Sequence, residues 1–308
     1  MIPEPIVFVL GPARGGTTFV NNLLAEWFDY TMGPEGTFVV PLYRKLRSYG
    51  DLGNDANFER LLGDIAASDM FEIMRSRWPA EHRVDINPTL IRRHLSERSY
   101  AGAVHAALSA LREARGRVRL GIKSPEYWTE LDELDAIFGA QARYIFVLRD
   151  GRDVALSNFQ VSWGQRNAHA SARRWVRMVD AVERFARGPG AGRLTMIRYE
   201  DILQDPETAI AGLEAFLAAP IAPERRARLM ASFAENPRGA NFDKWKTRMS
   251  PDELRAFESV AAQHLARHGY AVVDPRARIS PLEVARFSVQ ETMRKVVATV
   301  RKDLLGRR

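Results

Sequence analysis

The sequence has 308 residues, 46% apolar and 27% charged, which is typical of a globular protein with a large buried core. It has no cysteine, which excludes disulfides, thiolate metal sites and a cysteine nucleophile. The net charge of +7 suits an anionic ligand or surface, but no basic patch interleaved with aromatic residues indicates nucleic-acid binding. The first residues lack the positive region of a signal peptide and no run approaches about 20 apolar residues, so we expect a cytoplasmic protein.

Strand and helix patterns alternate along most of the chain. Apolar, β-rich runs predict strands at residues 6–10, 30–32, 83–86, 118–123, 143–148 and 194–199. Helical periodicity predicts helices at 18–27, 58–67, 68–77, 100–113, 129–138, 152–160 and 170–186. This alternation predicts an α/β fold, a P-loop-like three-layer arrangement in which helices flank a central, mostly parallel sheet. We expect one domain over residues 1–280, with a helical insertion at about 38–115 and a helical C-terminus.

A glycine-rich loop follows the first predicted strand and reads Gly11-Pro12-Ala13-Arg14-Gly15-Gly16-Thr17-Thr18. Its glycines have the spacing of a Walker A loop, whose backbone N–H groups bind phosphate together with the dipole of the next helix. Thr17 stands where a nucleoside-triphosphate loop carries its lysine, so ATP would lack its usual counter-charge here. A P-loop nucleoside or small-molecule kinase is the alternative, with Asp150 as its magnesium-binding acid.

The most specific stretch of the sequence runs from residue 144 to residue 157. Arg149 ends a buried strand, where open α/β sheets bind their ligands, and Ser157 lies one or two turns into the next helix. A guanidinium and a hydroxyl placed in this way can bind one phosphate together. Alternatively, the charged residues of this stretch form only a surface ion-pair cluster, which consists of Arg149, Asp150, Arg152 and Asp153.

These two segments resemble the phosphate-binding motifs of sulfotransferases that use 3′-phosphoadenosine 5′-phosphosulfate (PAPS). The loop is similar to the family's 5′-phosphosulfate loop, and residues 144–157 are similar to its 3′-phosphate motif. Residues 198–202 are similar to a further family segment, and residues 236–239 followed by 242–246 are similar to another. The resemblance implies PAPS as cofactor, adenosine 3′,5′-bisphosphate as product and no metal. It also implies these donor-binding residues: Arg14, Gly15, Gly16, Thr17, Thr18, Phe19, Arg149, Ser157, Tyr199 and Arg238.

Sulfuryl transfer is an in-line displacement that needs a base for the acceptor and a cation near the leaving phosphate. Lys123 opens a Lys-Ser-Pro segment similar to one in the family and is the expected cation, together with Arg14. One branch of the family uses a histidine two residues later, where this chain has Pro125. The chain therefore resembles the branch with a glutamate base, and Glu35 is the expected base.

The base and the acceptor stay open at the level of sequence. His105 and His169 lie in predicted helices that could line an acceptor pocket, so each competes with Glu35. The acceptor would offer a hydroxyl or an amine on a small molecule, a sugar or a lipid.

A basic amphipathic helix is predicted at residues 281–308, where apolar residues recur at helical spacing between arginines and lysines. Such a helix docks on its own domain, on a second subunit in a homodimer, or on an anionic membrane surface. The sequence does not choose among these partners.

Overall fold

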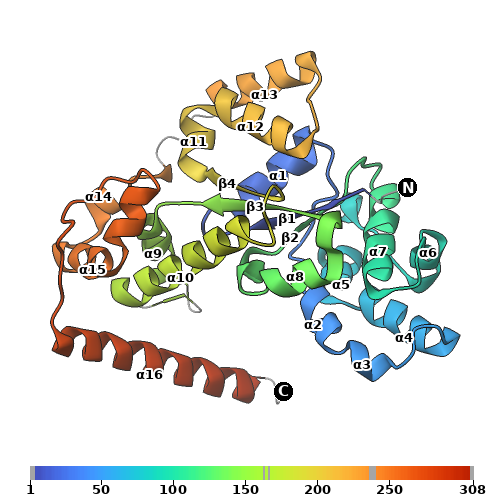
Figure 1. Ribbon diagram of the computed structural model, residues 1–308, viewed down its shortest axis with the longest axis horizontal. Coiled ribbons are helices and arrows are strands. Elements are labelled where there is room, and N and C mark those ends of the chain that lie inside the picture. The colour runs from blue at the N-terminus through green and yellow to red at the C-terminus, as the bar shows by residue number, and fades with distance from the viewer. Residues whose placement is uncertain (1–3, 162–163, 166, 236–240, 306–308) are drawn as a thin grey trace.

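The computed structural model describes residues 4–161, 164–165, 167–235 and 241–305. Its centre is a four-stranded, fully parallel sheet in the order β2-β1-β3-β4 (Figure 1). The strands are β1 (Ile6–Leu10), β2 (Gly121–Lys123), β3 (Ala142–Leu148) and β4 (Leu194–Arg198). In the register, Phe8 of β1 lies opposite Ile122 of β2 and Tyr144 of β3. The predicted parallel α/β fold is therefore confirmed.

Helices cover both faces of the sheet because alternate strand residues point to opposite sides and all of β1 is buried. On one face, Val7 and Val9 pack with α1 (Thr17–Trp27), α11 (Tyr199–Gln204), α12 (Pro206–Leu217) and α13 (Pro223–Glu235). On the other face, Phe8 and Leu10 belong to a larger core with α7 (Tyr100–Ala114), α8 (Leu131–Phe138) and α10 (Ala168–Arg187).

The predicted helical insertion lies beyond one end of the sheet (Figure 1). Before α7 it contains α2 (Val39–Arg44), α3 (Leu46–Tyr49), α4 (Asp55–Ala66), α5 (Asp69–Glu72), the π-helix η1 (Ile73–Arg77), the 3₁₀ turn η2 (Ala80–His82) and α6 (Pro88–Arg93). The predicted strand at residues 83–86 is wrong. The sheet edge beside β2 is already taken by residues 30–35, which form single parallel bridges from Tyr30 to Arg119 and from Glu35 to Lys123.

Two short 3₁₀ segments frame α8, namely η3 (Pro125–Thr129) and η4 (Gly139–Gln141). The opposite end of the sheet carries α9 (Gly151–Phe159), α14 (Trp245–Arg248) and α15 (Pro251–Arg267).

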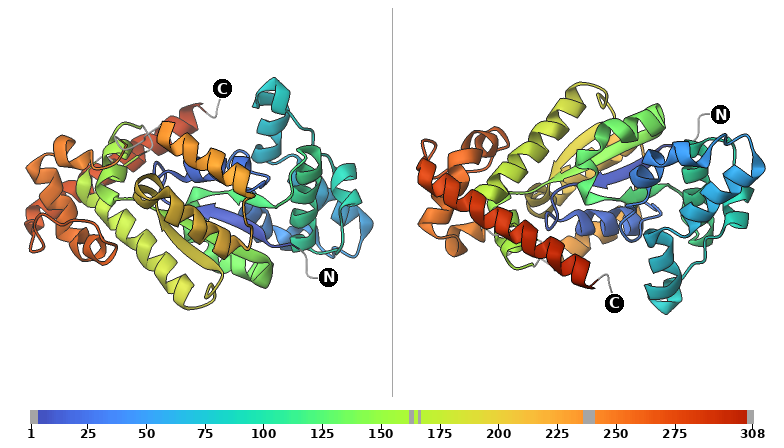
Figure 2. Two further views of the ribbon diagram at one scale, coloured as in Figure 1. Left: turned by 90° about the horizontal axis from the view of Figure 1, so that it is seen from above. Right: turned by 90° about the horizontal axis from the view of Figure 1, so that it is seen from below.

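The predicted tail helix is present as α16 (Pro281–Leu305), a long helix on the outside of the molecule (Figures 1 and 2). It is joined to α10 by a bond from Asn167 Nδ2 to the carbonyl of Phe287 and by the stacked rings of His169 and Phe287. Within the described residues, no helix has the length and apolar character needed to cross a bilayer.

Candidate active site

The carboxyl ends of all four strands meet at one edge of the sheet, as the parallel topology requires. The glycine-rich loop follows β1, Lys123 ends β2, Arg149 follows β3 and Tyr199 follows β4. A cleft of about 1090 Å³ opens at this edge. Predicted site residues that line it are Arg14, Gly16, Thr17, Thr18, Phe19, Glu35, Arg149, Ser157 and Tyr199.

The loop presents an uncapped helix N-terminus to the cleft. Gly16 is the N-cap of α1 and offers no side chain to the first N–H groups, and the first turn contains no acidic residue. Gly16 has a φ of 98°, and a Cβ there would lie 2.3 Å from the ring of Tyr199, so the position admits only glycine. A helix N-terminus without a side-chain cap or an acidic residue favours an anion through its dipole, so this loop suits an anionic ligand.

Arg149 lies beside the loop and is buried, with its guanidinium 4.8 Å from the centre of the Tyr199 ring. One terminal nitrogen donates to the carbonyl of Arg14 at 3.0 Å and the other donates to the carbonyl of Asn241. The Nε has no hydrogen-bond partner among the described residues. A buried donor without a partner costs free energy, so the site fits an anionic oxygen that would accept from it.

Arg14 and Ser157, which the resemblance assigns to the 5′-phosphosulfate and to the 3′-phosphate, are in direct contact. The Nε of Arg14 donates to Ser157 Oγ at 3.1 Å, which joins the loop after β1 to α9. Arg14 has a φ of 68°, a left-handed conformation that is rare outside glycine and that clusters at ligand sites. Gly15 lies in the same turn but does not line the cleft, and its N–H donates to the carbonyl of Pro12.

Aromatic rings form one wall of the cleft. Phe19 meets Tyr199 edge to face at 5.9 Å and Phe233 at 6.2 Å, and the hydroxyl of Tyr199 accepts from Asn241 Nδ2 at 2.7 Å. This wall suits the face of a purine base. The predicted ligand Arg238 lies outside the described residues. Asn241 and Phe233 were missed by sequence reasoning because neither lies in a motif with a chemical signature.

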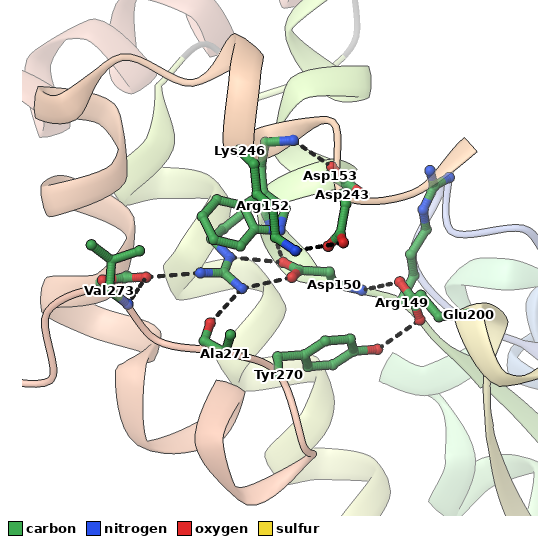
Figure 3. A network of polar contacts seen from close by, with 12 residues as sticks. Arg149, Asp150, Arg152, Asp153, Glu200, Asp243, Lys246, Tyr270, Ala271 and Val273 are labelled. Atoms are coloured by element: carbon green, nitrogen blue, oxygen red, sulfur yellow. Dashed lines mark hydrogen bonds and ion pairs between the residues drawn. The ribbon is translucent and has the colours of Figure 1, made fainter. Parts of the chain in front are cut away.

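The charged residues after Arg149 form a buried network, so the alternative of a surface ion-pair cluster is wrong (Figure 3). Arg152 is fully buried and binds both carboxylate oxygens of Asp150, Glu258 Oε1 and the carbonyl of Ala271. The guanidinium also lies 3.5 Å from the centre of the Trp245 ring. Helix α15 and the segment after it cover these charges, and sequence patterns do not reveal that cover.

The same network of buried polar groups extends to Glu200 in α11, directly after β4. Glu200 accepts from the N–H of Asp150 at 3.0 Å and from the hydroxyl of Tyr270 at 3.0 Å. Burial raises the pKa of Glu200 above its ordinary value. These contacts hold the turn that follows β3, and they therefore fix the direction in which Arg149 points.

Lys123 and Glu35 form the chemically distinctive pair of the site. Lys123 Nζ lies 3.5 Å from Glu35 Oε1 and 3.4 Å from Thr18 Oγ1. The lysine side chain is only 11% exposed, whereas the glutamate is 53% exposed at the mouth of the cleft. A parallel β-bridge joins the backbones of Glu35 and Lys123, and it holds the two residues next to each other. A buried cation beside an exposed carboxylate can stabilise negative charge while the carboxylate accepts a proton.

The rival bases lie elsewhere. His105 bonds through Nε2 to the carbonyl of Glu4 at 3.2 Å, and His169 stacks on Phe287 of α16. Neither histidine lines the cleft. Within the part of the chain that the structure describes, no group of His, Asp and Glu side chains has the arrangement of a metal site.

The parallel sheet brings the uncapped loop and the Lys123–Glu35 pair to one edge, an arrangement typical of α/β enzymes that act on anionic ligands. The family model described as "Sulfotransferase family" matches residues 5–223, and the chain belongs to that family, whose reaction is sulfuryl transfer. No curated protein sequence shows a significant match.

Solved sulfotransferase domains share this fold. The domain from the curacin biosynthetic pathway is 18% identical over 88% of this chain and 100% of its own, with a TM-score of 0.55. The domain from the Synechococcus PCC 7002 olefin synthase is 21% identical over 84% of this chain and 95% of its own, with a TM-score of 0.52.

Proposed function

We propose that the protein transfers the sulfuryl group of PAPS to a hydroxyl or an amine of an acceptor. The observation that carries this proposal is the Lys123–Glu35 pair beside the uncapped N-terminus of α1. The loop and Thr18 would hold the 5′-phosphosulfate, and Arg149 with Ser157 would hold the 3′-phosphate. Phe19 and Tyr199 would hold the adenine.

Each residue has a defined part in the reaction. When bound, the donor supplies an activated sulfuryl group. Glu35 takes the proton of the acceptor hydroxyl while the acceptor oxygen forms a bond to sulfur. The bond from sulfur to the 5′-phosphate oxygen breaks, and its electron pair stays on the phosphate. Lys123, Arg14 and the N–H groups of α1 offset the charge that develops there.

The kinase alternative has less support. Both carboxylate oxygens of Asp150, its expected magnesium ligand, accept from Arg152 inside the buried network. Thr17 holds the position of the phosphate-binding lysine. Asp150 therefore supports the site instead of facing the cleft.

Calorimetric binding of adenosine 3′,5′-bisphosphate tests the donor site. The Arg149→Ala variant should bind at least about tenfold more weakly, a loss of about 1.4 kcal/mol, and Ser157→Ala should also lose affinity. Arg143→Ala is the matched control, because Arg143 is the second residue of the same strand, lies over the Phe216 ring and donates to a backbone carbonyl, but is at the other end of β3 from Arg149. Absence of bisphosphate binding to the wild type, with binding of ATP–Mg, would refute the proposal in favour of a kinase.

For α16 we propose contact with an anionic membrane surface from a cytoplasmic location. Leu282, Val289 and Met293 are 80%, 54% and 65% exposed, and basic residues recur along the helix. Such contact would favour a lipid as the acceptor over a small molecule or a sugar. Co-sedimentation with phosphatidylserine vesicles should be lost on deletion of residues 281–308. Co-sedimentation that is unchanged in the deletion variant would contradict the proposed membrane contact. A homodimer in solution that dissociates when residues 281–308 are deleted would also contradict it.

A further inference from the structure

A second cavity of about 460 Å³ adjoins the donor cleft, and this volume lies in the usual range for small-ligand pockets, roughly 300–1,000 Å³. Ala13, Glu35 and Pro125 line both spaces. Glu35 thus stands at the junction between them. A molecule in the second cavity could therefore contact the proposed base while the donor occupies the cleft.

The wall of this second cavity combines apolar surface with two polar side chains. Val154, Trp175 and Met178 supply the apolar part. Asn158 and Ser171 also line it, and they are only 6% and 5% exposed. Asn158 Oδ1 and Ser171 Oγ have no hydrogen-bond partner among the described residues. Buried oxygens without partners are costly, so these two oxygens would gain from the hydrogen bonds of a ligand.

The charges around the second cavity are already paired. Glu126 and Arg174 form an ion pair with each other, and the Arg174 guanidinium also lies over the Trp128 ring. Glu35 is paired with Lys123. A charged group brought into this cavity would lose its water without gaining a free counter-charge from the described residues that line it, which disfavours ionic acceptors.

We infer that the second cavity takes a neutral alcohol with an apolar body and a second hydroxyl group. The reacting hydroxyl meets Glu35, the body packs on Val154, Trp175 and Met178, and the second hydroxyl bonds to Asn158 and Ser171. This inference rests on the proposed function, since it names the acceptor class for the same reaction.

A panel of straight-chain probes tests this acceptor class: 1,4-butanediol, 1,6-hexanediol and 1,8-octanediol, the matching primary alcohols, and the matching ω-hydroxy acids. Dissociation constants would be measured by ligand-observed NMR in the presence of adenosine 3′,5′-bisphosphate, and transfer rates with PAPS. The best diol should bind about fivefold more tightly than its monoalcohol, the effect of one hydrogen bond, and at least about tenfold more tightly than its hydroxy acid.

The variant Ser171→Ala should bring the diol-to-monoalcohol ratio close to one without changing bisphosphate affinity. Ser109→Ala is the control, because Ser109 is equally buried in α7 and lines neither cavity. A ratio near one in the wild type, a preference for the hydroxy acid, or an unchanged ratio in Ser171→Ala would each overturn the inference while bisphosphate binding persists. Loss of bisphosphate binding in the wild type would instead refute the proposed function.

Discussion

Replacing Arg152 by methionine should destabilise the protein strongly, because this fully buried guanidinium neutralises two buried carboxylates. Its Nε and one terminal nitrogen lie 3.0 and 2.7 Å from the oxygens of Asp150, and the other terminal nitrogen lies 2.8 Å from Glu258. Methionine keeps an apolar side chain but leaves both carboxylates unpaired. Removal of one partner from a buried ion pair costs about 3–5 kcal/mol, and we expect the upper part of this range because two acids lose their partner.

Urea unfolding followed by circular dichroism measures the loss in the free energy of unfolding. The comparison holds if the slope of that free energy against urea concentration is the same in the variant and the wild type. A triple variant, Arg152→Met with Asp150→Asn and Glu258→Gln, should recover at least half of the lost stability because it carries no unpaired charge. A deficit below about 1 kcal/mol, or no recovery in the triple variant, would refute the reasoning.

Three further changes test the site and its support. Glu35→Gln should lower kcat by about 10²–10⁴-fold and leave bisphosphate affinity unchanged, because it removes only the proton acceptor. Gly16→Ala should cost about 1–3 kcal/mol of stability, seen as a lower Tm, because its φ of 98° and the nearby Tyr199 ring oppose a Cβ. Burial lowers the pKa of His169, so the unfolded chain binds the proton more readily and stability should fall as the pH drops below about 6.5. His169→Phe, which keeps a ring against Phe287, should reduce that dependence in unfolding measured from pH 8 to pH 5.

Matched controls separate these effects from general damage. Glu72→Gln changes a glutamate that is also half exposed and paired with a cation, but it lies outside both cavities and should leave kcat unchanged. Gly63→Ala adds a Cβ inside α4 where nothing lies within 4 Å, so it should not lower Tm. His105 and His268 also have lowered pKa values and remain in the His169 variant, so an equally steep pH dependence would assign the effect to them.

The sequence predicts the parts of this protein that depend on local patterns. The β1 loop and the β3–α9 turn are short motifs whose chemistry follows from residue type and spacing, so Arg14, Arg149 and Ser157 could be assigned to one site before the structure. The strand predicted at residues 83–86 is absent, because these residues connect η2 to α6 within the helical insertion, away from the sheet edge that residues 30–35 occupy beside β2. The burial of Arg152 could not be predicted because its cover lies 106 and 119 residues away.

The second cavity lies beyond sequence reasoning for a similar reason. Asn158 and Ser171 sit on different helices, and Glu35 comes from the edge segment beside β2. No spacing along the chain signals that these three side chains line one space. The packing of α10 against α9 brings Asn158 near Ser171, and the bridge to Lys123 places Glu35 at the other side of the same space.

The long-range bonds of the buried network also set the order in which the protein can be completed during translation. Chains emerge from the ribosome N-terminus first, so the whole sheet is available before residue 223, where the family match ends. At that length Arg152 has only Asp150, and Arg149 lacks Asn241. The site can take its final form only after Glu258 and Ala271 have emerged. A nascent or truncated chain that ends near residue 223 therefore contains both phosphate motifs, but its Arg152–Asp150 pair lacks the cover of α15 and its Arg149 lacks one carbonyl partner.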